Sequence, residues 1–197
     1  MIRSQVRQAK PVDNDHYTVY LPAYSDERII KVLGEIKNVQ WEVFSKHSKK
    51  EYKEKNIHIR PVNNDDFIES LITCTGILCG AGFETPAEAM YLKKKLMAIP
   101  MKGQYEQQCN AAALKTMGIP IIKSLKKKHA DKIKAWVGTK QLILVNYPNS
   151  TERIINMIIK NHTDAVATKE IQLGEGIYSV KKLKEKSLGK ILNQLGE

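Results

Sequence analysis

The sequence predicts an α/β fold, a Rossmann-like three-layer domain built on a six-stranded, mostly parallel sheet. Short apolar segments alternate with helical patterns along residues 17–122, and the connections between them are short. This alternation is typical of parallel sheets with helices on both faces. A small-residue turn, Gly80–Gly82, follows one apolar segment and leads directly into a helical pattern. Strand, glycine turn and helix form a geometry in which backbone N–H groups converge on an anion.

Six segments rich in β-branched, aromatic and aliphatic residues are predicted as strands. The charged residues 46–55 are expected to connect the second strand to the third. The predicted strands are Tyr17–Leu21, Gln40–Phe44, Ile57–Arg60, Ile77–Cys79, Leu96–Pro100 and Ile119–Ile122.

Capping residues predict where the first helices begin. Ser25 is expected to cap a helix with Asp26 and Glu27 in its first turn, because acidic residues suit the positive end of a helix dipole. Residues 63–66 form a capping cluster before a short helix that contains Phe67.

The helix after the glycine turn is expected to have Thr85 as its N-cap and Pro86 as its first helical residue. Beyond residue 123 the pattern is weaker, with helices expected over residues 126–137 and from Thr151 to about residue 160.

Topology predicts where a ligand binds. Right-handed crossovers in a Rossmann-like order make the first and fourth strands neighbours. The strand order then reverses between the loop Ala23–Ser25 and the loop Gly80–Thr85. Because ligands of open α/β sheets bind at such a switch point, topology and the glycine turn indicate the same place independently.

Three regions are expected along the chain. Residues 1–14 are polar and aperiodic, with Pro11 breaking any helix, and are interpreted as a lead-in or interdomain linker. Residues 15–160 form the Rossmann-like domain. Residues 161–197 form a tail with an amphipathic basic helix over 180–195, whose apolar stripe is expected to pack on protein, with an anionic membrane surface as the alternative.

The formal net charge of +11 favours nucleic acids, anionic lipids or phosphorylated small molecules as ligands. Much of it lies in two lysine runs, residues 123–134 and 181–190, which we interpret as solvated helix faces. No run of about 18 apolar residues, as a membrane span requires, occurs in the sequence. The three cysteines form no even framework, so reduced thiols in the cytoplasm are expected.

Two common nucleotide motifs are missing. The third glycine of G-x-G-x-x-G is replaced by Thr85, and the motif follows the fourth strand instead of the first. A nicotinamide or flavin cofactor is therefore disfavoured. The sequence has no G-x-x-x-x-G-K-[ST], which excludes a P-loop.

The spacing between Gly80 and Gly118 resembles a known family. The segments G-A-G-F-E-T-P-A-E-A, I-P-M and E-Q-Q-C-N-A-A-A-L are similar to the donor-binding half of GT-B glycosyltransferases. The nearest relatives by this resemblance are the bacterial muropeptide N-acetylglucosaminyltransferase and the UDP-glucuronosyl and plant UDP-glycosyl transferases, with the family-28 C-terminal domain as the common unit. The resemblance implies one half of a GT-B fold.

The resemblance also implies roles for individual residues. It assigns the diphosphate of the donor to backbone N–H groups at the glycine turn, the ribose hydroxyls to a carboxylate, and the donor sugar to an acid–amide pair. The residues are Ser25, Gly82, Phe83, Glu84 and Thr85 for the diphosphate, Glu88 for the ribose, Asn64 and Phe67 for the base, and Glu106 and Gln107 for the sugar. No metal and no cofactor are implied, and the nucleotide sugar is a substrate.

Structural interpretations of the same residues remain open. Glu88 and Glu106 fit solvated helix positions, Gly82 fits close packing of a helix on a strand, and Asn110 fits a tie from its helix to the neighbouring loop. The sequence also departs from the family at Gly80, where a basic residue or histidine is usual. The pair Glu106–Gln107 differs from the Asp–Gln and Gln–Gln pairs of the relatives, which leaves the donor sugar open.

The resemblance thus implies the donor half of a hexosyltransferase-type glycosyltransferase that uses a nucleotide sugar with UDP as the expected nucleotide. The catalytic base is expected in an N-terminal acceptor domain, present as the missing part of a longer protein or as a partner chain, so that this chain alone is inactive. A cytoplasmic location is expected, with peripheral contact at the inner face of the membrane left open, and no specific nucleic acid. The alternatives are a nucleotide-sugar epimerase of the same fold and a non-catalytic basic module that binds nucleic acid or membrane.

Overall fold

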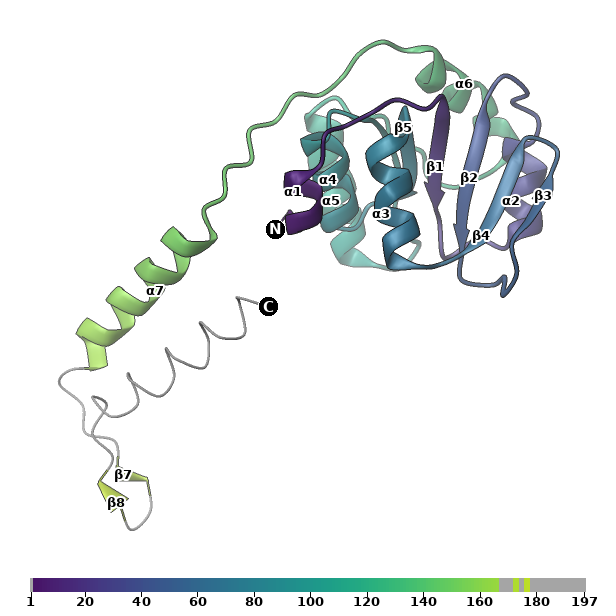
Figure 1. The fold of residues 1–197 in the computed structure, drawn as a ribbon. Coiled ribbons are helices and arrows are strands. Elements are labelled where there is room, and N and C mark those ends of the chain that lie inside the picture. The colour runs from purple at the N-terminus through teal and green to yellow at the C-terminus, as the bar shows by residue number, and fades with distance from the viewer. Residues whose placement is uncertain (1, 167–171, 174–175, 178–197) are drawn as a thin grey trace. The chain divides into compact units, whose positions relative to one another are not determined.

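The computed structural model describes residues 2–166, 172–173 and 176–177, and its first part is built on a mixed six-stranded sheet (Figure 1). The strand order is β3-β4-β2-β1-β5-β6, and every neighbouring pair is parallel except β3 and β4. The strands are β1 (His16–Tyr20), β2 (Gln40–Ser45), β3 (Tyr52–Glu54), β4 (Ile57–Pro61), β5 (Gly76–Gly80) and β6 (Lys95–Ile99).

The predicted fold class is confirmed, and so is the pairing of the first strand with the strand before the glycine turn. In β1 and β5, Val19 lies opposite Leu78 and Tyr20 lies opposite Cys79. The strand order therefore reverses at β1, where β2 and β5 lie on its two sides (Figure 1).

The sixth strand of the sheet is not the predicted one. Residues 119–122 make a single bridge, between Ile121 and Ala98, and so form no strand. The sixth strand is instead β3, in the charged segment 46–55, which pairs antiparallel with β4 after a turn at Lys55 in the left-handed region (φ 57°). All three residues of β3 are exposed at the sheet edge, so they lack the apolar alternation by which strands are recognised.

Helices cover both faces of the sheet, and the sheet separates the core into two apolar clusters. One cluster lies between the sheet and helices α2 and α6, and the other between the sheet and the remaining helices of this unit. The helices are α2 (Asp26–Leu33) and α6 (Ala130–Gly138) on the first face, with α1 (Ser4–Gln8), α3 (Asn64–Thr73), α4 (Glu84–Tyr91) and α5 (Tyr105–Thr116) on the second, and a short 3-10 turn at Lys127–His129.

The N-terminal segment contains a helix that the sequence analysis did not expect. Ile2 and Val6 are both buried in the cluster under α3 and α4. Val6 lies on α1, Ile2 lies just before its N-cap Arg3, and Pro11 lies beyond the end of this helix. Residues 2–8 therefore pack on the domain through both apolar side chains, and such tertiary packing stabilises a short helix.

The chain divides into two compact units, Met1–Tyr147 and Pro148–Glu197. In the second unit, α7 (Thr151–Val166) is longer than predicted, and β7 (Gln172–Leu173) pairs antiparallel with β8 (Gly176–Ile177). The predicted amphipathic stretch over 180–195 lies outside the described residues. Among the helices that are described, none is both long and apolar enough to cross a bilayer.

Candidate nucleotide-binding site

A small pocket lies at the carboxyl ends of β1, β5 and β6, where the sequence predicts the switch point. Its volume is about 100 Å³, and all three strand ends contribute to its wall. Tyr20 and Tyr24 come from the end of β1 and the loop that follows, and Gly80 and Gly82 from the end of β5. The parallel register Tyr20–Cys79 and Gly80–Ile99 brings these ends to one level.

Gln107, on the first turn of α5, is fixed in the wall of this pocket. Its Oε1 accepts a hydrogen bond from the Met101 backbone N–H at 3.0 Å, and its Nε2 donates to Gln104 Oε1 at 2.8 Å. A Cβ atom on Gly80 would lie 3.4 Å from Gln107 Oε1. This is an ordinary van der Waals distance, so the Gln107 amide lies directly against the end of β5.

Gly82 is not required by packing of the protein on itself. A Cβ atom at this position would meet no heavy atom within 4 Å. The interpretation of Gly82 as a close contact between helix and strand is therefore wrong. Gly82 also lines the pocket.

Helix α4 begins earlier than predicted, with Phe83 as its N-cap in place of Thr85. Pro86 is consequently the third helical residue. Proline is tolerated there because the first N–H groups of a helix have no intrahelical acceptor, so it does not mark the first position. The first turn of α4 has no side-chain cap, and the Phe83 side chain is 65% exposed. The N–H groups of Glu84 and Thr85 at this helix end are thus available to an anion.

Glu88, one turn further along α4, is completely buried and forms an ion pair with Arg3. Its Oε2 accepts from Arg3 Nη2 at 2.5 Å, and its Oε1 accepts from Arg3 Nε at 2.8 Å and from the Arg3 backbone N–H at 3.0 Å. The interpretation of Glu88 as a solvated helix residue is therefore wrong. The carboxylate raises the pKa of the Arg3 guanidinium, chiefly through this side-chain hydrogen bond.

Arg3 also connects Glu88 to Asn64 at the start of α3. Its Nη1 donates to Asn64 Oδ1 at 3.0 Å, so one guanidinium contacts two of the residues that the family resemblance places around the nucleoside. The sequence analysis did not single out Arg3. The apolar residues Ile2 and Val6 on either side of Arg3 could have indicated that this segment packs on the domain.

The other predicted site residues are buried, lie in the pocket wall or are exposed. Phe67 is buried and packs against Tyr20 and Phe44, with ring centroids 5.4 and 5.3 Å apart. Thr85 lines the pocket together with Gly82 and Gln107. Five predicted residues are exposed and do not line it, namely Ser25, Asn64, Phe83, Glu84 and Glu106.

Asn110 and Ser25 each form a hydrogen bond close to the pocket loops. Asn110 Nδ2 donates to the Ala81 carbonyl at 3.1 Å, which confirms that Asn110 ties α5 to the glycine turn. Ser25 is the N-cap of α2, as predicted, but its side chain accepts no capping bond. Its hydroxyl instead lowers the pKa of the Glu27 carboxyl through a hydrogen bond.

Comparison with solved structures places this fold among glycosyltransferases. MurG of Acinetobacter baumannii superimposes with a TM-score of 0.55 at 17% identity, over 79% of this chain and 52% of MurG. The glycosyltransferase SnogD from Streptomyces nogalater gives a TM-score of 0.49 at 12% identity, over 70% of this chain and 37% of SnogD. The likeness to MurG shows that the fold is that of a GT-B glycosyltransferase domain. The chain spans about half or less of the length of these two enzymes.

The family follows from the sequence itself. A family model described as glycosyl transferase family 1 matches residues 1–139, and the chain belongs to this family. The match covers the whole sheet and includes α1, so the N-terminal helix is part of the family's domain. A search of curated proteins finds no match.

The ion pair between Arg3 and Glu88 generates a stability prediction. Arg3→Ala should lower the free energy of unfolding by about 3–5 kcal/mol, because it leaves a buried carboxylate without its partner. Urea denaturation monitored by circular dichroism measures this change. The matched variant with both Arg3→Met and Glu88→Leu should recover most of the loss, since it removes both charges together. An Arg3→Ala variant as stable as the parent protein would contradict the role given to this pair.

Proposed function

We propose that this chain is the donor-binding half of a glycosyltransferase and holds a nucleotide sugar, with UDP as the nucleotide, at the carboxyl ends of β1, β5 and β6. The observation that carries the proposal is the open space in front of Gly82, beside the uncapped N-terminus of α4. Membership of glycosyl transferase family 1 supports it. The proposed reaction is transfer of a hexosyl group to an acceptor.

In this proposal the diphosphate lies at the start of α4. Backbone N–H groups of Phe83, Glu84 and Thr85 donate to its oxygens, and the helix dipole adds a favourable field. As the sugar leaves, negative charge develops on the diphosphate, and prearranged donors stabilise this charge without reorganisation. Ser25, in the loop that faces the glycine turn, is proposed to approach the phosphates from the side of β1.

The sugar and the base would lie on opposite sides of the diphosphate. Gln107 is proposed to contact the sugar hydroxyls from its fixed position in the pocket wall, with the exposed Glu106 beside it. Asn64 is proposed to contact the base. Phe67 would act through packing and its backbone, because its ring is buried against Tyr20 and Phe44.

Glu88 is proposed to accept hydrogen bonds from the ribose hydroxyls, which requires a movement. Arg3 encloses the carboxylate with three hydrogen bonds in this structure. The Arg3 side chain is 31% exposed and its bond to Asn64 lies at the surface, so the guanidinium can turn outward without crossing the core. Ribose hydroxyls would then replace part of the hydrogen bonding that Arg3 supplies.

The acceptor and the catalytic base are proposed to come from an N-terminal domain or a partner chain across a cleft. The chain alone is therefore proposed to bind the donor without transferring sugar.

Nucleotide binding tests the proposal directly. Calorimetry should show binding of UDP, and weaker binding of ADP and GDP. Gly82→Val should weaken UDP binding by at least about tenfold, since its side chain fills the space proposed for the diphosphate. Gly138→Val is the matched control, because a Cβ atom at Gly138 also meets nothing within 4 Å but lies at the end of α6, outside the pocket. Equal or absent binding of all three nucleotides would refute the donor site.

The ribose contact has a separate test. UDP lacking both ribose hydroxyls should bind the parent protein about tenfold or more weakly than UDP, as expected for hydrogen bonds to a charged group. In Glu88→Gln the two nucleotides should differ much less. If the parent protein binds both equally, Glu88 does not contact the ribose and serves only to hold Arg3.

A further inference from the structure

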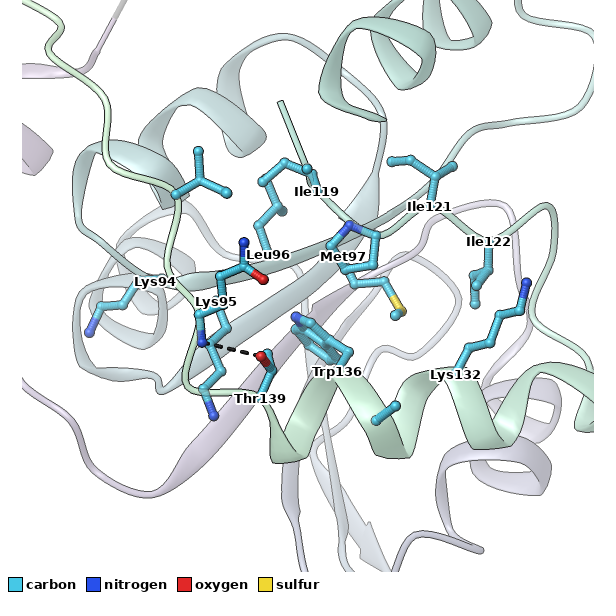
Figure 2. Close-up of a pocket in the computed structure, with 15 residues that line it drawn as sticks. Lys94, Lys95, Leu96, Met97, Ile119, Ile121, Ile122, Lys132, Trp136 and Thr139 are labelled. Atoms are coloured by element: carbon cyan, nitrogen blue, oxygen red, sulfur yellow. Dashed lines mark hydrogen bonds between the residues drawn. The ribbon is translucent and has the colours of Figure 1, made fainter. Parts of the chain in front are cut away.

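A second pocket, of about 430 Å³, lies at the outer edge of β6 (Figure 2). It is bounded by residues 94–97, residues 118–122, helix α6 and residues 139–143. The nucleotide pocket lies at the carboxyl end of β6, near Ile99, whereas this pocket lies at the amino end, near Lys95. The two sites are therefore distinct.

This pocket exists because residues 119–122 do not pair fully with β6. The Ala98 N–H donates to the Pro120 carbonyl and the Ala98 carbonyl accepts from the Ile122 N–H, both at 3.2 Å. Since alternate residues of a strand bond toward opposite sides, the N–H and C=O groups of Leu96 point to the same outer edge. Within the described residues they have no backbone partner there. Because this strand pairing is incomplete, the outer edge of β6 has both a space and the two backbone polar groups of Leu96.

The walls of the pocket are mainly apolar. Figure 2 shows the Trp136 indole and the Met97 side chain between the strand and α6, with isoleucine side chains above them. The Trp136 Nε1–H is buried and has no hydrogen-bond partner among the described residues. The larger apolar lining residues include Leu96, Met97, Ile119, Ile121, Ile122 and Trp136. A volume of this size falls in the range of small-molecule sites, roughly 300–1,000 Å³.

The charged groups at the pocket are all cationic. Lys94, Lys95 and Lys132 line it, and no aspartate or glutamate does. Lys94 points away, toward the Val12 carbonyl, to which its Nζ donates at 2.6 Å (Figure 2). Lys95 Nζ donates to two neutral oxygens, Tyr17 Oη at 3.0 Å and the Val137 carbonyl at 2.9 Å.

Lys132 is the cation best placed for a ligand. Its side chain is exposed and lies at the rim of the pocket beside Ile122 (Figure 2). In the part of the chain that the structure describes, neither Lys95 nor Lys132 forms an ion pair with a carboxylate, whereas Lys134 on the same helix lies 3.7 Å from Asp131. Burial lowers the pKa of Lys95, against a smaller, opposite effect of the Asp13 carboxylate.

We propose that this pocket binds an amphipathic carboxylate, whose apolar chain lies along Met97, Ile122 and Trp136 and whose carboxylate pairs with Lys132. Lys95 adds positive potential behind it. The apolar walls exclude a purely polar anion such as free phosphate as the preferred ligand, because it would leave them in contact with water. The lysines favour a carboxylate over an alcohol of the same length.

Tryptophan fluorescence with ω-bromodecanoate tests the position of the chain, because bromine quenches an indole that it contacts. The protein has two tryptophans, and the other one, Trp41, is completely buried in the core. The probe should quench the fluorescence of the parent protein saturably, and Trp41→Phe should keep this quenching. Trp136→Phe should abolish it. No saturable quenching, or equal quenching in Trp136→Phe, would overturn the proposal.

Charge reversal tests the head group. Lys132→Glu should weaken binding of ω-bromodecanoate by about tenfold or more, through loss of the ion pair and repulsion. Lys134→Glu is the matched control, exposed on the same helix but outside the pocket, and should change the affinity less than about threefold. The neutral ω-bromodecanol should bind both variants alike. Unchanged binding of the carboxylate to Lys132→Glu would overturn the proposal, and thermal melts establish that both variants are folded.

Discussion

The parallel pairing of β1 with β5 is the constraint on which the nucleotide site depends. Leu78 faces the apolar cluster under α2 and α6, and its neighbour Cys79 faces the cluster under α3 and α4. A slip of one residue would exchange these faces and bury the wrong side chains, so the core fixes the register. With Tyr20 opposite Cys79, the loops after both strands must open side by side. The pocket between Tyr24 and Gly82 follows from that register.

The burial of Glu88 is a second constraint, and it extends to the N-terminus. An ionised carboxylate removed from water is tolerated only when it is paired and hydrogen-bonded. Within the described residues, Arg3 supplies the three hydrogen bonds that the Glu88 carboxylate accepts, so helix α4 holds the segment around α1 in place. The same guanidinium contacts Asn64. Sequence positions 3, 64 and 88 thus form one unit next to the start of α4, and a change in any of them is transmitted to the others.

Much of this fold could be predicted from the sequence, because the adjacent strands β1 and β5 each have four of their five residues buried and are rich in β-branched, aromatic or aliphatic side chains. The pairing of β1 with β5 followed from right-handed crossovers together with a Rossmann-like strand order. The predictions are wrong where a short sequence pattern is compatible with more than one local structure. Pro86 is compatible with several positions in the first turn of a helix, and β3 is an exposed edge strand without alternation. Residues 119–122 look like a strand, yet they pair at Ala98 only.

The candidate site was predictable in place but not in detail. The glycine turn and the topology indicate the carboxyl ends of β1 and β5, and the pocket lies there. The pairing of Glu88 with Arg3 could not be predicted, because it joins residues 85 positions apart through a helix of only five residues. Local sequence patterns do not indicate which acidic residue forms an ion pair with which basic residue in the folded protein. The open space in front of Gly82 likewise depends on packing in three dimensions.

The central claim is that backbone N–H groups at the start of α4 hold the donor diphosphate. Amide chemical-shift perturbation by NMR tests it most directly, with UDP titrated into the uniformly 15N-labelled protein and uridine, which lacks phosphates, as the comparison. The account predicts that UDP produces its largest shifts at the amides of Gly82, Phe83, Glu84 and Thr85, and that uridine leaves these four amides nearly unchanged. Shifts centred on the lysine-rich residues 123–134, with the α4 amides unaffected by UDP, would contradict it.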